Sequence, residues 1–380
     1  KPLYHKKFLT IGDFYREKYG RSVEILVTLC IGVSYLGWVS AQIMALGLVF
    51  HVVSDGAISQ NTGMLIGSGS VLIYTLFGGM WAVAITDFVQ MIIVVVGLLY
   101  IGHELSAMTG GVMTVVNHAH AAGLLKFFPE NNPAAILAFI AALFTMMLGS
   151  IPQQDVFQRV TTSKTVGIAQ SAAILGGLLY FAFAFVPMYL VYSGTLIDPE
   201  MVSSLLETDS QLILPQLILK HTPLFAQIMF FGALLSALKS CASATLLAPS
   251  VSFSENIIKD FFDHPSPKKM LSIMRITVVV FAVIVTVVAM NSQLSIFKMV
   301  ENAYKVTLVG AFIPLVFGIY WKRANPIGGL LSLTFGIVSW LLAELVLPEF
   351  IVPAQLLGLL ASLAGMLIGG FLIPQEFLKK

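Results

Sequence analysis

The chain has 380 residues, of which 57% are hydrophobic and only 11% charged, and its formal net charge is +2. Its mean hydropathy of +0.90 excludes a soluble domain of this length, which would expose large apolar patches. The small net charge gives no reason to expect nucleic acid as a partner. We therefore predict an all-α, polytopic protein embedded in the lipid bilayer.

Apolar runs that approach the roughly 20 residues needed for a membrane-crossing helix recur along the whole chain. We predict about ten transmembrane helices, at residues 24–52, 63–79, 82–105, 134–151, 166–194, 225–258, 270–291, 298–320, 326–346 and 353–373. Together they form one transmembrane domain, 24–373, between a cytoplasmic segment, 1–23, and a cytoplasmic tail, 374–380. The Gly78-Gly79 pair is predicted to form a tight turn between two crossings.

The positions of Lys and Arg indicate the orientation, because these residues accumulate on the cytoplasmic side of a membrane protein. With residues 1–23 inside, sixteen of the 21 Lys and Arg lie on the cytoplasmic side, and the outside carries only Lys126, Lys220 and Lys298. Lys239 and Lys305 are left within the spans. This asymmetry predicts a multi-pass protein of the plasma (inner) membrane.

The helix predicted at 134–151 ends in Gly149-Ser150-Ile151-Pro152, directly before Gln153. Broken helices with polar residues beside the break are typical of secondary transporters, which bind solutes there. Ser150 and Gln153 are therefore predicted to bind the substrate. The alternative for Ser150 is that its hydroxyl stabilises the kink.

The helix predicted at 225–258 carries Lys239, Ser240, Cys241 and Ser243 near its middle. Hydrocarbon offers no partner for a charge or a hydroxyl, so polar groups at this depth indicate a functional site. Ser240 and Ser243 are three residues apart and share one helix face, from which both hydroxyls can reach one ion. The alternative is that these serines bond carbonyl groups of their own helix.

Four stretches follow one another in a recognisable order: FLTIGDFY at 8–15, YTLFGGMWAV at 74–83 with Thr86-Asp87, QQDVFQR at 153–159, and GAFIP to WKR at 310–323. Together they resemble the sodium:solute symporter family, and the third is most similar to its choline-transporter branch. The resemblance implies the LeuT-type architecture of inverted helix repeats, with solute and cation near the midplane. Laid on that template, the chain is expected to lack the family's first three helices.

The same resemblance implies a sodium site at Ser240 and Ser243, with Asp87 and Cys241 as further cation-binding residues. Sodium is a hard cation that prefers oxygen, so the thiol of Cys241 weakens this site. Lys239 is a predicted modulator, whose ammonium lies near Asp87 and competes with sodium or replaces it. The alternative places Lys239 in a water-filled vestibule. The coupling ion is therefore sodium or a proton, and no other cofactor is expected.

These observations predict a secondary active transporter of a small organic solute that works by alternating access. An enzyme is not expected, because the sequence contains no phosphate-binding loop, carboxylate pair or nucleophile–base pair. The alternative function is a transporter-derived solute sensor or a degenerate membrane module that does not transport. Tyr35 and Trp38 are expected to be packing residues, although converging aromatic rings would suit a quaternary ammonium solute. Glu301 and Lys305, four residues apart, are predicted to form an ion pair.

Overall fold

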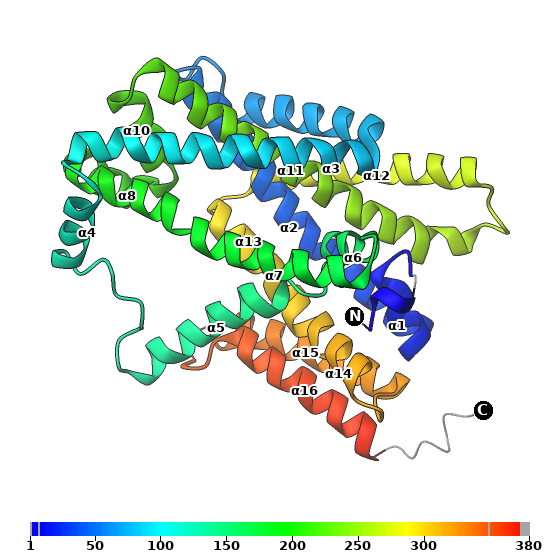
Figure 1. Ribbon diagram of the computed structural model, residues 1–380. Helices are drawn as coiled ribbons and strands as arrows, with labels where there is room; N and C mark the ends of the chain where they lie inside the picture. The colour runs from blue at the N-terminus through cyan, green and yellow to red at the C-terminus, as the bar shows by residue number, and fades with distance from the viewer. Residues whose placement is uncertain (1, 7, 349, 373–380) are drawn as a thin grey trace. The chain divides into compact units, whose positions relative to one another are not determined.

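The computed structural model describes residues 2–6, 8–348 and 350–372, except for the side chains of residues 79–83 and 372 (Figure 1). Helices and loops account for all of these residues, so the predicted all-α class is confirmed. The predicted tail, 374–380, lies outside the described residues. The α-helices are α1 (Ile11–Tyr19), α2 (Arg21–Val53), α3 (Gln60–Thr109), α4 (Val112–Ala121), α5 (Pro133–Gly149), α6 (Gln154–Thr161), α7 (Val166–Phe183), α8 (Phe185–Ile197), α9 (Pro199–Thr208), α10 (Ile213–His221), α11 (Leu224–Asn256), α12 (Pro267–Asn291), α13 (Ile296–Thr307), α14 (Ile313–Tyr320), α15 (Pro326–Val346) and α16 (Ala354–Leu372).

The number of helices suited to cross a membrane agrees with a multi-pass protein. Within the described part of the chain, eight helical segments are long and apolar enough, and the bent pair α5 and α6 provides a ninth. That pair bends by 46°, at the break predicted from Gly149 to Pro152. Nine of the ten predicted ranges correspond to these spans, and the tenth, 63–79, is the first part of α3.

The turn predicted at Gly78-Gly79 takes the form of a bend within one helix and not of a loop. Tyr74 and Thr86 join their hydroxyl groups in a hydrogen bond although they are 12 residues apart. A straight α-helix would separate their Cα atoms by about 18 Å, so α3 must bend sharply between them, and its ribbon turns back on itself (Figure 1). The backbone stays helical because an apolar environment leaves its polar groups no other partners.

The chain divides into two compact units. Unit 1 consists of Lys1–Ala41, Pro129–Ala169 and Thr245–Lys380, and unit 2 of Gln42–Phe128 and Gln170–Ala244. Three helices, α2, α7 and α11, pass from one unit into the other along the chain.

In unit 2, the second arm of α3 runs antiparallel to the first half of α11. A Cβ atom added to Gly97 would lie 3.4 Å from the Met229 carbonyl oxygen, and the rings of Tyr100 and Phe225 meet edge to face with their centroids 5.4 Å apart. As the residue number rises along α3, that of its partner on α11 falls. This register brings residues near 87 beside residues near 240.

The first arm of α3 packs on the end of α2 through glycines. Gly63 and Gly67 form a small-xxx-small pair, and a Cβ atom at Gly63 would lie 2.8 Å from the carbonyl oxygen of Gly47. Such pairs let membrane helices approach closely, because packing replaces the missing hydrophobic driving force in lipid. A larger side chain at either position would force the two backbones apart.

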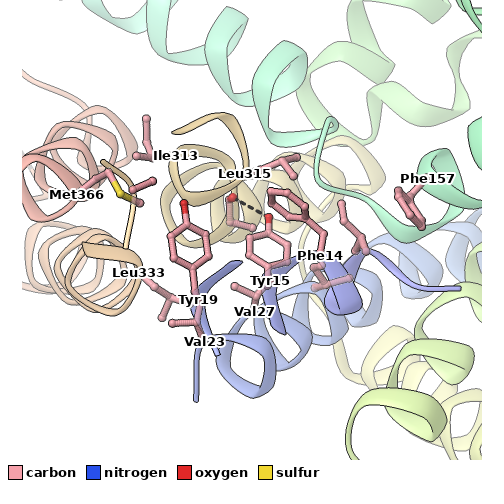
Figure 2. Close-up of a cluster of buried hydrophobic side chains, with 14 of the residues drawn as sticks. Phe14, Tyr15, Tyr19, Val23, Val27, Phe157, Ile313, Leu315, Leu333 and Met366 are labelled. Carbon is pink, nitrogen blue, oxygen red and sulfur yellow. Dashed lines mark hydrogen bonds between the residues drawn. The ribbon is translucent and has the colours of Figure 1, made fainter. Parts of the chain in front are cut away.

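In unit 1, the short helix α1 belongs to the buried core. Thr10 accepts a hydrogen bond from the backbone N–H of Asp13, whose carboxylate accepts one from Thr10 in return, so α1 begins with a capping box. Phe14, Tyr15 and Tyr19 then pack into one cluster with residues of α2, α6, α14, α15 and α16 (Figure 2). The sequence analysis did not identify α1 as a core element, because this helix has only nine residues and carries several charges.

The tyrosines of α1 also donate hydrogen bonds to carbonyl groups at a helix break in the last part of unit 1. Between α13 and α14 the chain forms a π-helical turn, Leu308–Phe312, followed by Pro314, which has no N–H and interrupts the helical bonding pattern. The hydroxyl of Tyr15 donates to the Ala311 carbonyl at 2.9 Å (Figure 2) and that of Tyr19 to the Pro314 carbonyl at 2.7 Å. Two carbonyls beside the break thus gain partners from a distant segment.

The predicted ion pair between Glu301 and Lys305 is wrong. Glu301 pairs with Lys298 at 2.7 Å, and the buried Lys305 lies 3.7 Å from a carboxylate oxygen of Glu344. Helical spacing permitted the pairing within α13, but each of the two side chains forms its ion pair with a different residue. Lys305 therefore links α13 to α15.

Candidate functional site

The polar groups of α11 meet the carboxylate of α3 within unit 2. The Ser240 hydroxyl donates a hydrogen bond to Oδ1 of Asp87, across 153 positions of sequence. Ser240 lies near the middle of the candidate span Leu224–Phe261, and Asp87 is the fourth residue of the candidate span Ala84–Thr109. An acid and a hydroxyl are thereby held together where lipid offers neither of them a partner.

The neighbouring residues of α11 differ from one another in their surroundings. Ser243 is fully buried, and its hydroxyl donates to the Ser240 carbonyl at 2.9 Å. Cys241 is half-buried and is not part of a disulfide. Ser243 therefore bonds a carbonyl group of its own helix, as the alternative interpretation expected, whereas the Ser240 hydroxyl bonds a residue of another helix. A hydroxyl that donates its hydrogen keeps its oxygen lone pairs, so both serines retain the capacity to ligate a cation.

Lys239 has an aromatic neighbour. Its ammonium lies 5.2 Å from the centroid of the Tyr74 ring, a distance at which the ring face attracts a cation. Tyr74 bonds Thr86, which directly precedes Asp87. Lys239, Tyr74, Thr86, Asp87 and Ser240 thus form one small polar group. Within it, the Asp87 carboxylate accepts a hydrogen bond from Ser240, and the Lys239 ammonium faces the Tyr74 ring.

The second predicted region, after the break of α5, lies in unit 1. Gln153 is buried, and its side-chain N–H donates to the Ser34 hydroxyl at 2.9 Å and to the Thr307 hydroxyl at 3.3 Å. Thr307 in turn donates to the carbonyl of Gly149 at 2.7 Å. One amide thus connects α2, the break after α5 and the end of α13.

A pair of aromatic rings lies one helical turn from these contacts. Trp38 and Tyr304 face each other with ring centroids 4.8 Å apart and planes inclined by 42°. Trp38 follows Ser34 by one turn, and Tyr304 precedes Thr307 by one turn. Two buried polar atoms here, the indole N–H of Trp38 and the side-chain oxygen of Gln153, find no partner among the described residues. A buried donor and a buried acceptor without partners are costly unless something bonds them.

The other polar residues around the break have structural partners. The Ser150 hydroxyl donates to the Met147 carbonyl at 3.1 Å, as expected for a serine that stabilises a kink. Tyr35, expected to be a packing residue, accepts the backbone N–H of Asp155 at 2.9 Å and bonds its carboxylate. It therefore holds the start of α6 against α2.

Several members of both groups were not identified from the sequence as site residues. Tyr74 and Thr86 lie inside the family signature at 74–90, so that motif contained a signal for them. Ser34 and Thr307 carried none, because an isolated Ser or Thr in an apolar helix usually bonds its own backbone. Trp38 was assigned to packing on its helical spacing alone.

The profile of the Sodium:solute symporter family matches residues 1–336 of the chain. The chain belongs to this family. Human high affinity choline transporter 1 is 26% identical to it over 353 residues, which are 89% of this chain and 59% of the human protein. The osmoregulated proline transporter OpuE of Bacillus subtilis is 26% identical over 382 residues, covering 93% and 73% of the two chains. The chain spans about three fifths of the length of the choline transporters that it matches.

Among solved structures, a Na+-coupled sialic acid symporter in a substrate-bound, outward-open state has the same fold. The TM-score is 0.78 at 19% identity, over 97% of this chain and 78% of that one. The similarity confirms the LeuT-type, all-helical fold predicted for this member of the symporter family. These relatives are transporters by name, and the family membership together with the apolar helices identifies the chain as a multi-pass membrane protein.

Proposed function

We propose that the protein is a secondary symporter of the plasma membrane that moves a small organic solute together with sodium. The observation that carries this proposal is the bond between Ser240 and Asp87 inside two antiparallel apolar helices. A carboxylate that is partly withdrawn from water in an apolar helix is stabilised by a cation beside it. The choline, proline and sialic acid transporters named above support a small organic solute and sodium coupling.

In this proposal the cation-binding residues are Asp87, Ser240 and Ser243, with Cys241 beside them. Asp87 supplies the charge and the serines supply hydroxyl oxygen, the ligand type that hard cations prefer. The thiol of Cys241 is a poor ligand for sodium, so we propose that Cys241 lines the site without binding the ion.

We propose that the solute contacts Gln153, with Ser150 as a weaker contact at the same break. The unpartnered oxygen of Gln153 accepts a hydrogen bond and the unpartnered N–H of Trp38 donates one, so a solute with both a donor and an acceptor satisfies both. The Trp38 and Tyr304 rings add a surface suited to a cationic or apolar group. A hydroxyl-bearing quaternary ammonium compound or an amino acid meets these requirements.

Lys239 is the residue that would change how solute movement is coupled to the sodium gradient in this protein. Its ammonium belongs to the same polar group as Asp87 and repels an arriving sodium ion. We propose that it weakens sodium binding or takes over part of the role of the cation. Solute movement would then depend less on the sodium gradient than the names of the relatives imply.

The test is uptake by cells that express the protein at its natural length. Radiolabelled choline, proline and sialic acid are each offered with sodium or potassium outside, at two pH values. Saturable uptake of one solute that sodium stimulates is the expected result. If none of these solutes enters above vector controls and none exchanges in counterflow, the proposal is contradicted for this solute class.

The second candidate function is a solute sensor that binds without transporting, and Lys239 and Cys241 favour it. A lysine side chain and a thiol beside the cation site replace groups that would otherwise couple an ion gradient to solute movement. Solute binding to the purified protein without uptake or counterflow would support this second function.

A further inference from the structure

A pocket of about 860 Å³ lies within unit 2, outside both groups described above. Its walls are formed by the end of α3, by helix α4, by residues 124–127 after α4, and by α8. Its volume is in the range of small-molecule sites, about 300–1,000 Å³. Its lining includes no residue that we assigned to the cation or the solute.

The walls of the pocket are mainly hydrocarbon. Leu99 from α3, Val115 and Val116 from α4, and Phe185 and Met188 from α8 line it. The spans that contain the α3 and α8 residues, Ala84–Thr109 and Val166–Ile197, are mostly unburied, because only 11% and 6% of the most apolar window of each is buried inside the protein. Such surfaces are stable in contact with acyl chains.

The segment after α4 has the composition of a membrane interface. Leu124, Leu125, Phe127 and Phe128 are exposed, with Phe127 at 74% and Phe128 at 76% of their surface, and they flank Lys126. Apolar side chains on both sides of a lysine place that lysine where lipid head groups lie. Lys126 itself lines the pocket, so one cationic group stands beside an apolar volume.

Two tyrosines complete the lining. Tyr192 donates its hydroxyl hydrogen to the Leu124 carbonyl at 3.2 Å and so fastens the segment after α4 to α8. Tyr189, one turn earlier on α8, has a buried hydroxyl with no partner among the described residues. A buried hydroxyl of this kind is stabilised by an oxygen acceptor.

We propose that this pocket binds an anionic phospholipid, with one acyl chain against the apolar walls. The phosphate lies against the Lys126 ammonium, and a phosphate or ester oxygen accepts the hydrogen bond of Tyr189. Charge complementarity at Lys126 favours an anionic head group over a zwitterionic one. The bound lipid links α3, α4 and α8, and no feature of the cation or solute sites is required for it.

The test uses the purified protein at its natural length in nanodiscs of phosphatidylglycerol mixed with phosphatidylcholine. Lipids that remain bound after detergent extraction are counted by native mass spectrometry. We expect phosphatidylglycerol to be retained in preference to phosphatidylcholine. Lys126→Gln should lower this retention about fivefold, the ratio that corresponds to roughly 1 kcal/mol per lysine at an anionic surface, and Lys220→Gln is the matched control that should leave it unchanged.

Two further variants separate the pocket from the surface charge. Val116→Trp fills the apolar volume and should abolish retention, while Tyr189→Phe should reduce it with no change in size; both are compared at equal thermal stability. Equal retention of the two lipids, or retention unaffected by both Lys126→Gln and Val116→Trp, would overturn the proposal. Retention of free palmitate and not of phosphatidylglycerol would also overturn the proposal. Retention of no lipid at all, because another segment of the protein closes the pocket, would overturn it as well.

Discussion

Ser240 of α11 donates its hydroxyl hydrogen to the carboxylate of Asp87 on α3. The two helices pass each other in antiparallel directions, and Gly97 and Tyr100 on α3 meet Met229 and Phe225 on α11 in the same register. The bond is therefore a consequence of how the two helices pack along their length.

This relationship leads to a graded prediction for sodium binding. Asp87→Asn removes the carboxylate and should raise the sodium concentration for half-maximal uptake by about 10- to 100-fold, since bonds to charged groups contribute about 1.5–3 kcal/mol. Ser240→Ala removes one neutral ligand and should cost roughly fivefold, or about 1 kcal/mol. The measurement is the sodium concentration for half-maximal uptake. Equal affinities in the wild type and in Asp87→Asn would exclude Asp87 from the cation site.

Substitution of Lys239 should act in the opposite direction. Like charges roughly 10 Å apart at an effective dielectric constant of about 20 repel by about 1.7 kcal/mol. Lys239→Met keeps the length and apolar stem of the side chain and should increase sodium affinity by roughly tenfold. Lys239→Arg, which retains the charge, is the matched control. Unchanged sodium-stimulated uptake in Lys239→Met would remove Lys239 from the coupling mechanism.

The amide of Gln153 should control solute affinity more strongly than Ser150 does. Gln153→Leu deprives Ser34 and Thr307 of their bond and removes the unpartnered oxygen. We expect the KM for the solute to rise by at least tenfold, the equivalent of about 1.4 kcal/mol. Ser150→Ala should change KM less, because the Ser150 hydroxyl already bonds Met147. The reverse order of effects would place the solute nearer to Ser150.

Loss of the Tyr15 hydroxyl should destabilise unit 1. Tyr15→Phe leaves the buried carbonyl of Ala311 without its bond, at a cost of about 1–3 kcal/mol. The denaturant midpoint of the purified protein is the measurement, and Tyr320→Phe, which removes an exposed phenol, is the control. A midpoint that is equal in Tyr15→Phe and in the wild type would show that the break near Pro314 does not depend on this bond.

The pH dependence of the Tyr15 contribution follows from its burial. Removal from water raises the pKa of Tyr15 well above its usual value, because burial disfavours the charged phenolate. A group whose pKa is raised in the folded state contributes stability that is fully present below its unfolded pKa, near 10, and is lost as the pH rises through the folded pKa. The difference in unfolding free energy between wild type and Tyr15→Phe should therefore have the same value at about pH 7 as at about pH 9. A tyrosinate absorbance assigned to Tyr15 in folded protein near pH 10 would contradict the burial.

Close packing of α2 on α3 should tolerate no side chain at Gly63. Gly63→Val places atoms against the carbonyl of Gly47, whose oxygen would already lie 2.8 Å from a Cβ atom. Overpacking of this kind costs about 1–3 kcal/mol, so the variant should melt at a lower temperature. Gly69→Val, at a position with nothing within 4 Å of the added Cβ, is the matched control.

The sequence alone determined the class of this protein, nine of its candidate spans, the break after Gly149 and the family. Those features depend on apolar length, on charge distribution and on contiguous motifs, all of which are local to a stretch of chain. It also pointed to Asp87, Ser240 and Gln153, because polar residues are conspicuous inside apolar helices.

Only the tertiary structure decided which of these groups meet. Ser240 bonds a residue 153 positions away, Gln153 bonds Ser34 and Thr307, and Lys239 lies on the ring of Tyr74. The short helix α1 enters the core because its tyrosines supply hydrogen bonds that the interrupted segment between α13 and α14 needs. Such pairings depend on the register and rotation of packed helices, which spacing within one segment does not encode.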